Sequence, residues 1–197
     1  MKPTAPLLVA IGGSAGAYEL VVAILENLPT HFDAAIVIVL HRNSKYETRI
    51  ESSLSDRFGR EIRAIRDKMP ILTNEIYFAP PGYHTLVEPD FIFSLDVSDP
   101  VQYSRPSIDV FFESVADVYQ DRCVALLLSG ANKDGANGFR ALIRHGASCY
   151  VQQPGEALIS TMPQAGLDVH SKVVPWNHQE IINFFRNNLK TETHEND

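Results

Sequence analysis

Short apolar runs alternate with amphipathic stretches along most of the chain. The runs are continuous rather than alternating, as expected of strands buried on both faces, and they cover 7–11, 35–40, 123–128 and 148–152. Apolar residues at helical spacing predict helices over 18–28, 47–58, 108–119, up to His145, over 162–167 and after Asn177, with a short last strand over 171–174. This alternation favours an α/β fold with a doubly wound, mostly parallel sheet and helices on both faces.

The middle of the chain has a different pattern. Short strand-like runs at 76–79, 85–88 and 91–95 are separated by Pro80-Pro81-Gly82 and Pro89-Asp90. Proline, glycine and aspartate at these positions are typical of tight turns. We therefore expect a β-hairpin excursion near the active site rather than a further strand–helix unit.

Chemically useful side chains follow three of the buried strands. Ser14 lies in the Gly12-Gly13-Ser14-Ala15-Gly16 loop after the first, His41 follows the second, and Asp134 comes soon after 123–128. Because ligands bind at the carboxyl ends of parallel strands, the three are expected at one edge of the sheet. A serine, an imidazole base and an orienting carboxylate are what nucleophilic acyl chemistry requires.

The glycine loop has a second interpretation, as a dinucleotide-binding turn. A G-x-G-x-x-G fingerprint starting at Gly12 would need glycines where Ser14 and Ala17 stand, and His41, not an acidic residue, ends the second strand. The loop does match G-x-S-x-G, which presents a nucleophile between a strand and a helix. The chain order Ser, His, Asp differs from that of the α/β-hydrolases.

Composition narrows the function further. The chain has 197 residues and a formal net charge of −7, which argues against a nucleic-acid partner. Cys123 and Cys149 lie in or beside apolar runs, as buried free thiols do, and no metal-ligand spacing occurs. No signal peptide or membrane span is visible, so we expect a cytoplasmic protein without membrane insertion. One domain over 1–190 and a disordered acidic tail over 191–197 are predicted.

Taken together, the separated motifs resemble the catalytic domain of the chemotaxis protein-glutamate methylesterase family. The resemblance covers nearly the whole chain, and the motifs occur in the family's order. They are VAIGGSAG at 9–16, VLH at 39–41, IYFAPPGYH at 76–84, RPSIDVFF at 105–112 and LSGANKDGA at 128–136.

The resemblance implies a serine esterase that releases methanol from glutamyl methyl esters on the cytoplasmic helices of chemoreceptors, with glutamine deamidation in some members. By this resemblance Ser14 is the nucleophile, His41 the base and Asp134 the orienting carboxylate. Backbone N–H groups near Ala15 and Ala131 would hold the oxyanion, and neither a metal nor a cofactor is implied. The alternative is a non-catalytic scaffold of the same fold that binds receptor or partner proteins.

Typical members carry an N-terminal receiver domain, whereas about six residues precede the first strand here. We therefore expect constitutive activity or a receiver protein acting in trans. A basic edge, consisting of Arg42, Lys45, Arg49 and Lys133, lies near the predicted site, and each of these residues is expected to be a solvated charge. The alternative is that the set attracts an acidic receptor.

Three further polar residues are expected to be structural rather than substrate ligands. His84 lies in the hairpin signature, and Ser107 and Asp109 look like a helix cap and a first-turn acid. Thr161 is expected to fold back near the active loop.

Overall fold

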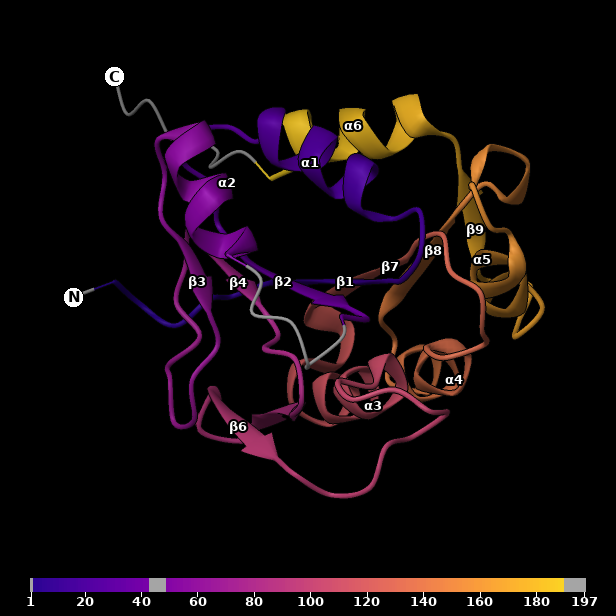
Figure 1. Ribbon diagram of the computed structural model, residues 1–197, viewed down its shortest axis with the longest axis horizontal. Coiled ribbons are helices and arrows are strands. Elements are labelled where there is room, and N and C mark those ends of the chain that lie inside the picture. Colours follow the sequence, from indigo (N-terminus) through magenta and orange to yellow (C-terminus); the bar gives the residue numbers. More distant parts are fainter. Residues whose placement is uncertain (1, 43–48, 190–197) are drawn as a thin grey trace.

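The computed structural model describes residues 2–42 and 49–189 and contains a seven-stranded sheet in the order β3-β4-β2-β1-β7-β8-β9 (Figure 1). Every neighbouring pair in this sheet is parallel, which confirms the predicted architecture. Its strands are β1 (Leu8–Gly13), β2 (Ala35–Leu40), β3 (Ile62–Ala64), β4 (Glu75–Phe78), β7 (Cys123–Leu127), β8 (Ser148–Gln152) and β9 (Val174–Trp176). A separate antiparallel hairpin pairs β5 (His84–Glu88) with β6 (Ile92–Asp96).

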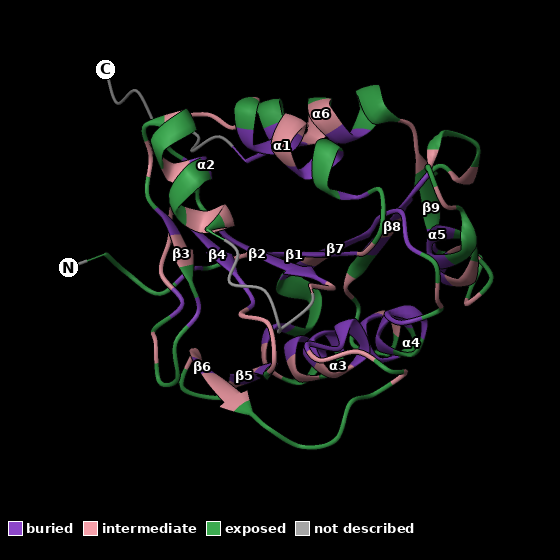
Figure 2. Ribbon diagram, viewed as in Figure 1, coloured by how far each residue is buried: buried purple, intermediate pink, exposed green. Residues whose placement is uncertain are grey.

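Helices cover both faces of the sheet. Figure 1 shows α1 (Tyr18–Glu26), α2 (Ile50–Phe58) and α6 (His178–Asn187) on one face, α3 (Ile108–Tyr119) and α4 (Ala136–Arg144) on the other, and α5 (Thr161–Leu167) beside the β8 end. The core consequently forms two clusters. Val9 and Ile11 of β1 belong to one, whereas Leu8 and Ala10 belong to the other, because successive strand side chains point to opposite faces. The sheet between them is buried throughout its centre (Figure 2).

The structure corrects two predictions about the strands and adds one strand at the edge of the sheet. The run at 76–79, grouped with the hairpin, is β4 of the main sheet and pairs with β2, so the excursion consists of β5 and β6 alone. The last strand lies at Val174–Trp176 and not at 171–174, and β3 was not predicted. These edge strands are short or carry exposed residues, so their hydrophobic pattern is weak.

Strand β1 lies where the winding direction reverses. From β1 the chain builds β2, β4 and β3 on one side and later β7, β8 and β9 on the other. Such a switch point opens a crevice at the carboxyl ends of the strands, which is where doubly wound proteins bind their ligands. Gly12 permits this arrangement, because a Cβ there would lie 2.5 Å from Cγ2 of Ile108 at the start of α3.

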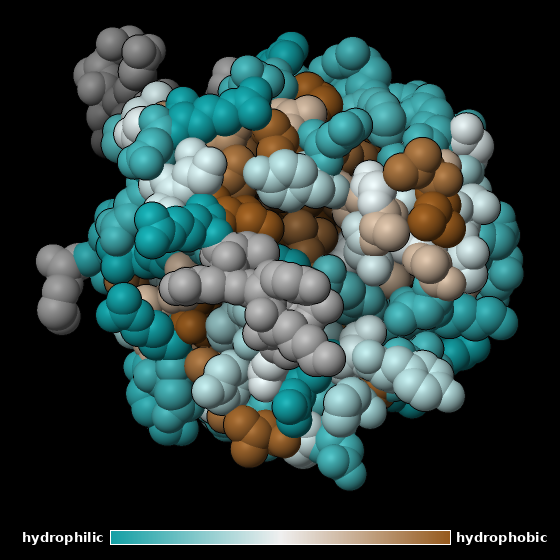
Figure 3. All heavy atoms as spheres, in the orientation of Figure 1, coloured by the Kyte–Doolittle hydropathy of each residue, from teal (hydrophilic) through white to brown (hydrophobic). Residues whose placement is uncertain are grey.

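Among the described residues, no helix has the length and apolar character needed to cross a membrane. The face seen in Figure 3 is predominantly hydrophilic, with hydrophobic side chains gathered in its hollowed centre. The predicted tail over 191–197 lies outside the described residues.

Candidate active site

Ser14 and His41 follow directly on neighbouring strands at the switch point. The parallel register pairs Gly13 with Leu40, and the His41 N–H donates to the Gly13 carbonyl at 3.1 Å. On the other side of β1, the Ser14 N–H donates to the Ser129 carbonyl beyond β7 at 2.9 Å. The backbone ladder therefore fixes the Ser14 loop between the two segments that carry the other predicted residues.

The imidazole and the carboxylate of the predicted site are in direct contact. His41 Nε2 lies 2.8 Å from Asp134 Oδ2, although the residues are 93 positions apart in the chain. The His41 side chain is 12% exposed and that of Asp134 is fully buried. The pair has the arrangement in which a carboxylate orients an imidazole, with Nε2 toward the carboxylate.

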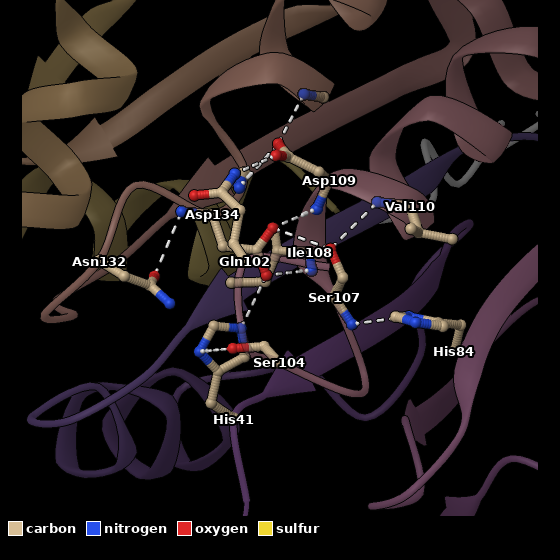
Figure 4. A network of polar contacts seen from close by, with 12 residues as sticks. His41, His84, Gln102, Ser104, Ser107, Ile108, Asp109, Val110, Asn132 and Asp134 are labelled. Atoms are coloured by element: carbon tan, nitrogen blue, oxygen red, sulfur yellow. Dashed lines mark hydrogen bonds and ion pairs between the residues drawn. The ribbon is translucent and has the colours of Figure 1, made fainter. Parts of the chain in front are cut away.

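Asp134 is held by the first turn of α3 (Figure 4). Its Oδ1 accepts from Ser107 Oγ and from the N–H of Asp109, both at 2.9 Å, and its Oδ2 accepts from the Ile108 N–H at 2.7 Å. Burial alone would raise the pKa of Asp134, but the hydrogen bonds from His41 and from the Asp109 and Ile108 N–H groups outweigh it and lower that pKa. The carboxylate is thus ionised and fixed, and it accepts the Nε2–H of His41.

Asp109, in the first turn of α3, accepts hydrogen bonds from the start of α4 in a similar way. Its Oδ1 accepts from the N–H groups of Gly135 and Gly138, both at 2.8 Å, at the start of α4. Its Oδ2 accepts from Gln102 Nε2 at 2.6 Å. Ser107 and Asp109 were predicted as a cap and a first-turn acid, and Ser107 does accept from the Val110 N–H. Sequence reasoning missed that both also hold Asp134 and the loop that carries it.

The loop that carries Ser14 makes a tight turn and is held by hydrogen bonds to Ser129. Gly16 adopts a φ of +83°, which side-chain-bearing residues rarely adopt. Ser129 Oγ donates to the Ala15 carbonyl at 2.7 Å and accepts from the Ile159 N–H. In the described part of the chain, the N–H groups of Ala15 and Ala131 and the hydroxyl of Ser14 form no hydrogen bond. The Ser14 hydroxyl is half-buried and is not bonded to His41 in this structure.

A hydroxyl that the sequence did not indicate contacts the second ring nitrogen of His41. Ser104 Oγ lies 3.2 Å from His41 Nδ1 (Figure 4). Ser104 belongs to the irregular segment between β6 and α3, which has no hydrophobic period and gave no signal in the sequence.

Most of the remaining predicted residues are also accounted for. His84 is buried, accepts from the Ser107 N–H at Nδ1 and donates to the Asp99 carbonyl at Nε2, which confirms a structural role. Thr161 begins α5, whose Met162 packs against Gly130 in the aspartate loop. Cys123 and Cys149 are buried and not disulfide-bonded, as predicted. No group of three or more potential metal ligands occurs within 2–42 and 49–189.

The predicted basic edge is corrected in part. Arg42 is not a solvated charge, because its guanidinium contacts Glu51 Oε1 at 2.7 Å and donates to the Ala79 carbonyl. Arg49 and Lys133 are exposed, and Lys45 lies outside the described residues. What the structure describes of this edge is therefore less basic than the sequence suggested.

Known proteins resemble this chain over most of its length. The family model described as CheB methylesterase matches residues 9–183. A putative protein-glutamate methylesterase/protein-glutamine glutaminase of Leptospira interrogans (strain Fiocruz L1-130) is 36% identical over 186 residues, which cover 92% of this chain and 96% of that protein. Protein-glutamate methylesterase/protein-glutamine glutaminase 1 of Pseudomonas fluorescens (strain Pf0-1) is 31% identical over 84% of this chain, which spans only 49% of that longer relative.

The fold is shared with a solved structure. The crystal structure of the Thermotoga maritima CheB methylesterase catalytic domain superposes with a TM-score of 0.77 and 24% sequence identity, and the match covers 93% of this chain and 96% of that one. The family match extends over both strands that precede Ser14 and His41 and over the Asp134 loop. By its sequence and its fold, the chain belongs to the CheB methylesterase family.

Proposed function

We propose that the chain is a protein-glutamate methylesterase that hydrolyses glutamyl methyl esters on the cytoplasmic helices of chemoreceptors. The observation that carries the proposal is the 2.8 Å contact between His41 Nε2 and the buried Asp134 carboxylate, beside the loop that bears Ser14. The names of the relatives support the same chemistry and add glutamine deamidation as a second activity of this site.

The contact with Asp134 assigns a different role to each ring nitrogen of His41. Because Nε2–H is donated to Asp134, the unprotonated Nδ1 is the atom that takes the proton from Ser14 Oγ. Ser14 Oγ then forms a bond to the ester carbonyl carbon, and the carbonyl electron pair moves onto oxygen. The N–H groups of Ala15 and Ala131, which have no partner among the described residues, are the proposed donors to this oxyanion.

The second half of the reaction reverses the proton transfer. The imidazolium gives its proton to the leaving methoxide, methanol departs, and an acyl-enzyme ester remains on Ser14. His41 then takes a proton from water, the resulting hydroxide attacks the acyl carbonyl, and Ser14 leaves with the proton returned by His41. With a glutamine side chain the leaving group is ammonia and the remaining steps are the same.

We further propose that one catalytic domain spans residues 1–190. Its support is that seven strands, of which β1 is the first along the chain and β9 the last, form one sheet, and that the family match runs from residue 9 to 183. Regulation by a receiver protein in trans stays a prediction.

The decisive experiment is Ser14→Ala. We expect release of methanol from methyl-labelled receptor to fall by about 10⁴- to 10⁶-fold, because removal of a nucleophile leaves only binding and oxyanion stabilisation. A serine-directed phosphonate should label the wild type at Ser14 and leave the variant unlabelled. Absence of both turnover and labelling in the wild type would instead support the non-catalytic scaffold.

A further inference from the structure

The base of the site has both ring nitrogens occupied. His41 Nε2 contacts Asp134 Oδ2 at 2.8 Å, and Nδ1 lies 3.2 Å from Ser104 Oγ. With the proton on Nε2, Nδ1 has a single lone pair in the ring plane, so the Ser104 hydroxyl is the donor and the imidazole is the acceptor. This lone pair is the one that must accept the proton of the nucleophile.

Ser104 is held at the ring by a tight turn. The N–H of Val101 donates to the Ser104 carbonyl at 3.2 Å, and the N–H of Ser104 donates to the Val101 carbonyl at 2.9 Å. Between them Gln102 and Tyr103 have φ values of 48° and 63°. Gln102 Nε2 also donates to Asp109 Oδ2, and this hydrogen bond links the turn to the first turn of α3. The Ser104–His41 contact is therefore built into the fold rather than made by a loose side chain.

The contact lies on the wall of a cavity of about 370 Å³ that reaches His41. Residues lining it include Gly82, Pro100 and Tyr103. Tyr103 is fully exposed at its rim, and Ser104 is half-buried. A volume of this size leaves room for the Ser104 hydroxyl to rotate off the ring.

We infer that Ser104 is a positioning residue that occupies His41 Nδ1 in the unliganded site and has to release it before Ser14 can be activated. The inference rests on the proposed function and goes beyond it, because it adds a step of hydroxyl exchange before acylation. Only one hydroxyl can use the lone pair at a time, and the Ser14 hydroxyl is unbonded in the described part of the chain while Ser104 holds that position. Loss of the competing hydroxyl therefore increases the fraction of molecules in which the base is available.

The test compares Ser104→Ala with Ser104→Thr, which keeps a hydroxyl, and with Ser98→Ala in the same segment, whose hydroxyl bonds Asp96 and not the site. Labelling by a serine-directed phosphonate is followed over a range of concentrations, giving a limiting rate constant and a half-saturating concentration. We expect Ser104→Ala to raise the limiting rate constant by about 2- to 10-fold, the net value of one hydrogen bond, and to leave the half-saturating concentration unchanged. Ser104→Thr should return toward the wild-type rate, and Ser98→Ala should match it.

A limiting rate constant in Ser104→Ala that is unchanged or lower would overturn the inference, provided that the variant melts like the wild type. Label found on Ser104 instead of Ser14 would also overturn it and would make Ser104 the nucleophile. These failures are separable from failure of the proposed function, in which the wild type is not labelled at all or Ser14→Ala still turns over.

Discussion

Two buried carboxylates lie at the starts of the adjacent helices α3 and α4. Each accepts hydrogen bonds from the backbone at the start of the helix that it does not itself precede or belong to. Asp134, just before α4, accepts the first N–H groups of α3, whereas Asp109, in α3, accepts the N–H groups of Gly135 and Gly138 at the start of α4. Both exploit the positive end of a helix. The difference is in the remaining partners, since Asp134 meets the imidazole of His41 and Asp109 meets the side-chain amides of Gln102 and Asn137.

The pKa values of the pair diverge accordingly. Burial is the largest cause and raises the pKa of Asp109, and the nearby Asp134 charge raises it further. The hydrogen bonds from the Gly138 N–H, from Gln102 and from the Gly135 N–H lower that pKa without cancelling the rise. The pKa of Asp134 is lowered, because its donors outweigh its burial. A helix N-terminus alone therefore does not lower the pKa of a buried carboxylate. Both carboxylates accept several hydrogen bonds, but only Asp134 of the two has an imidazole among its described partners.

Among the variants that test this comparison, Asp134→Asn is expected to have the largest effect. The amide cannot accept from all the donors around it and favours the wrong tautomer of His41, so we expect methanol release to fall by about 10⁴-fold, as for a serine protease that loses its triad carboxylate. The measurement is single-turnover hydrolysis of methylated receptor, with circular dichroism to establish that the variant is folded. Activity within tenfold of the wild type would show that Asp134 does not orient the base.

Asp109→Ala tests the other carboxylate, and its main effect should be on stability. The buried N–H groups of Gly135 and Gly138 lose their acceptor, and each one left unpaired costs about 1–3 kcal/mol in the free energy of unfolding. Urea denaturation measures this loss. Asp117→Ala on the same helix is the control, because Asp117 is exposed and should change stability by less than about 0.5 kcal/mol. An equal loss in both variants would contradict the reciprocal capping.

The smallest expected effect is on the pH dependence of unfolding. A lowered folded pKa gives Asp134 a stabilising contribution that is present above its ordinary value of 3.8 and is lost as pH falls through the folded value. A raised folded pKa gives Asp109 the opposite sign, so its contribution is present below 3.8 and is lost as pH rises through the folded value.

Urea midpoints between about pH 2 and pH 7 separate the two carboxylates. The stability advantage of the wild type over Asp134→Asn should shrink toward acid, whereas its advantage over Asp109→Asn should grow. Parallel pH profiles for the two variants would show that the carboxylates share one environment and that the contrast drawn from their partners is wrong.

Much of this site could be predicted because its parts follow strands. Ser14, His41 and Asp134 each come after a buried apolar run, and parallel strands bring their carboxyl ends to one edge. Ser104 and Gln102 could not be found in this way. They lie in a segment without regular structure, and only a turn in three dimensions brings them to His41 and Asp109.

The sequence by itself determined the fold class, the family and the strand ends that carry Ser14, His41 and Asp134, because those depend on local hydrophobic period and short motifs. Only the tertiary structure decided which nitrogen of His41 meets Asp134, that Asp109 caps α4, that Arg42 is paired with Glu51, and that Ser104 contacts the other ring nitrogen of His41. Each of those contacts joins atoms that are distant in the chain or lie in irregular loops. Their geometry is set by packing around them, which no local pattern encodes.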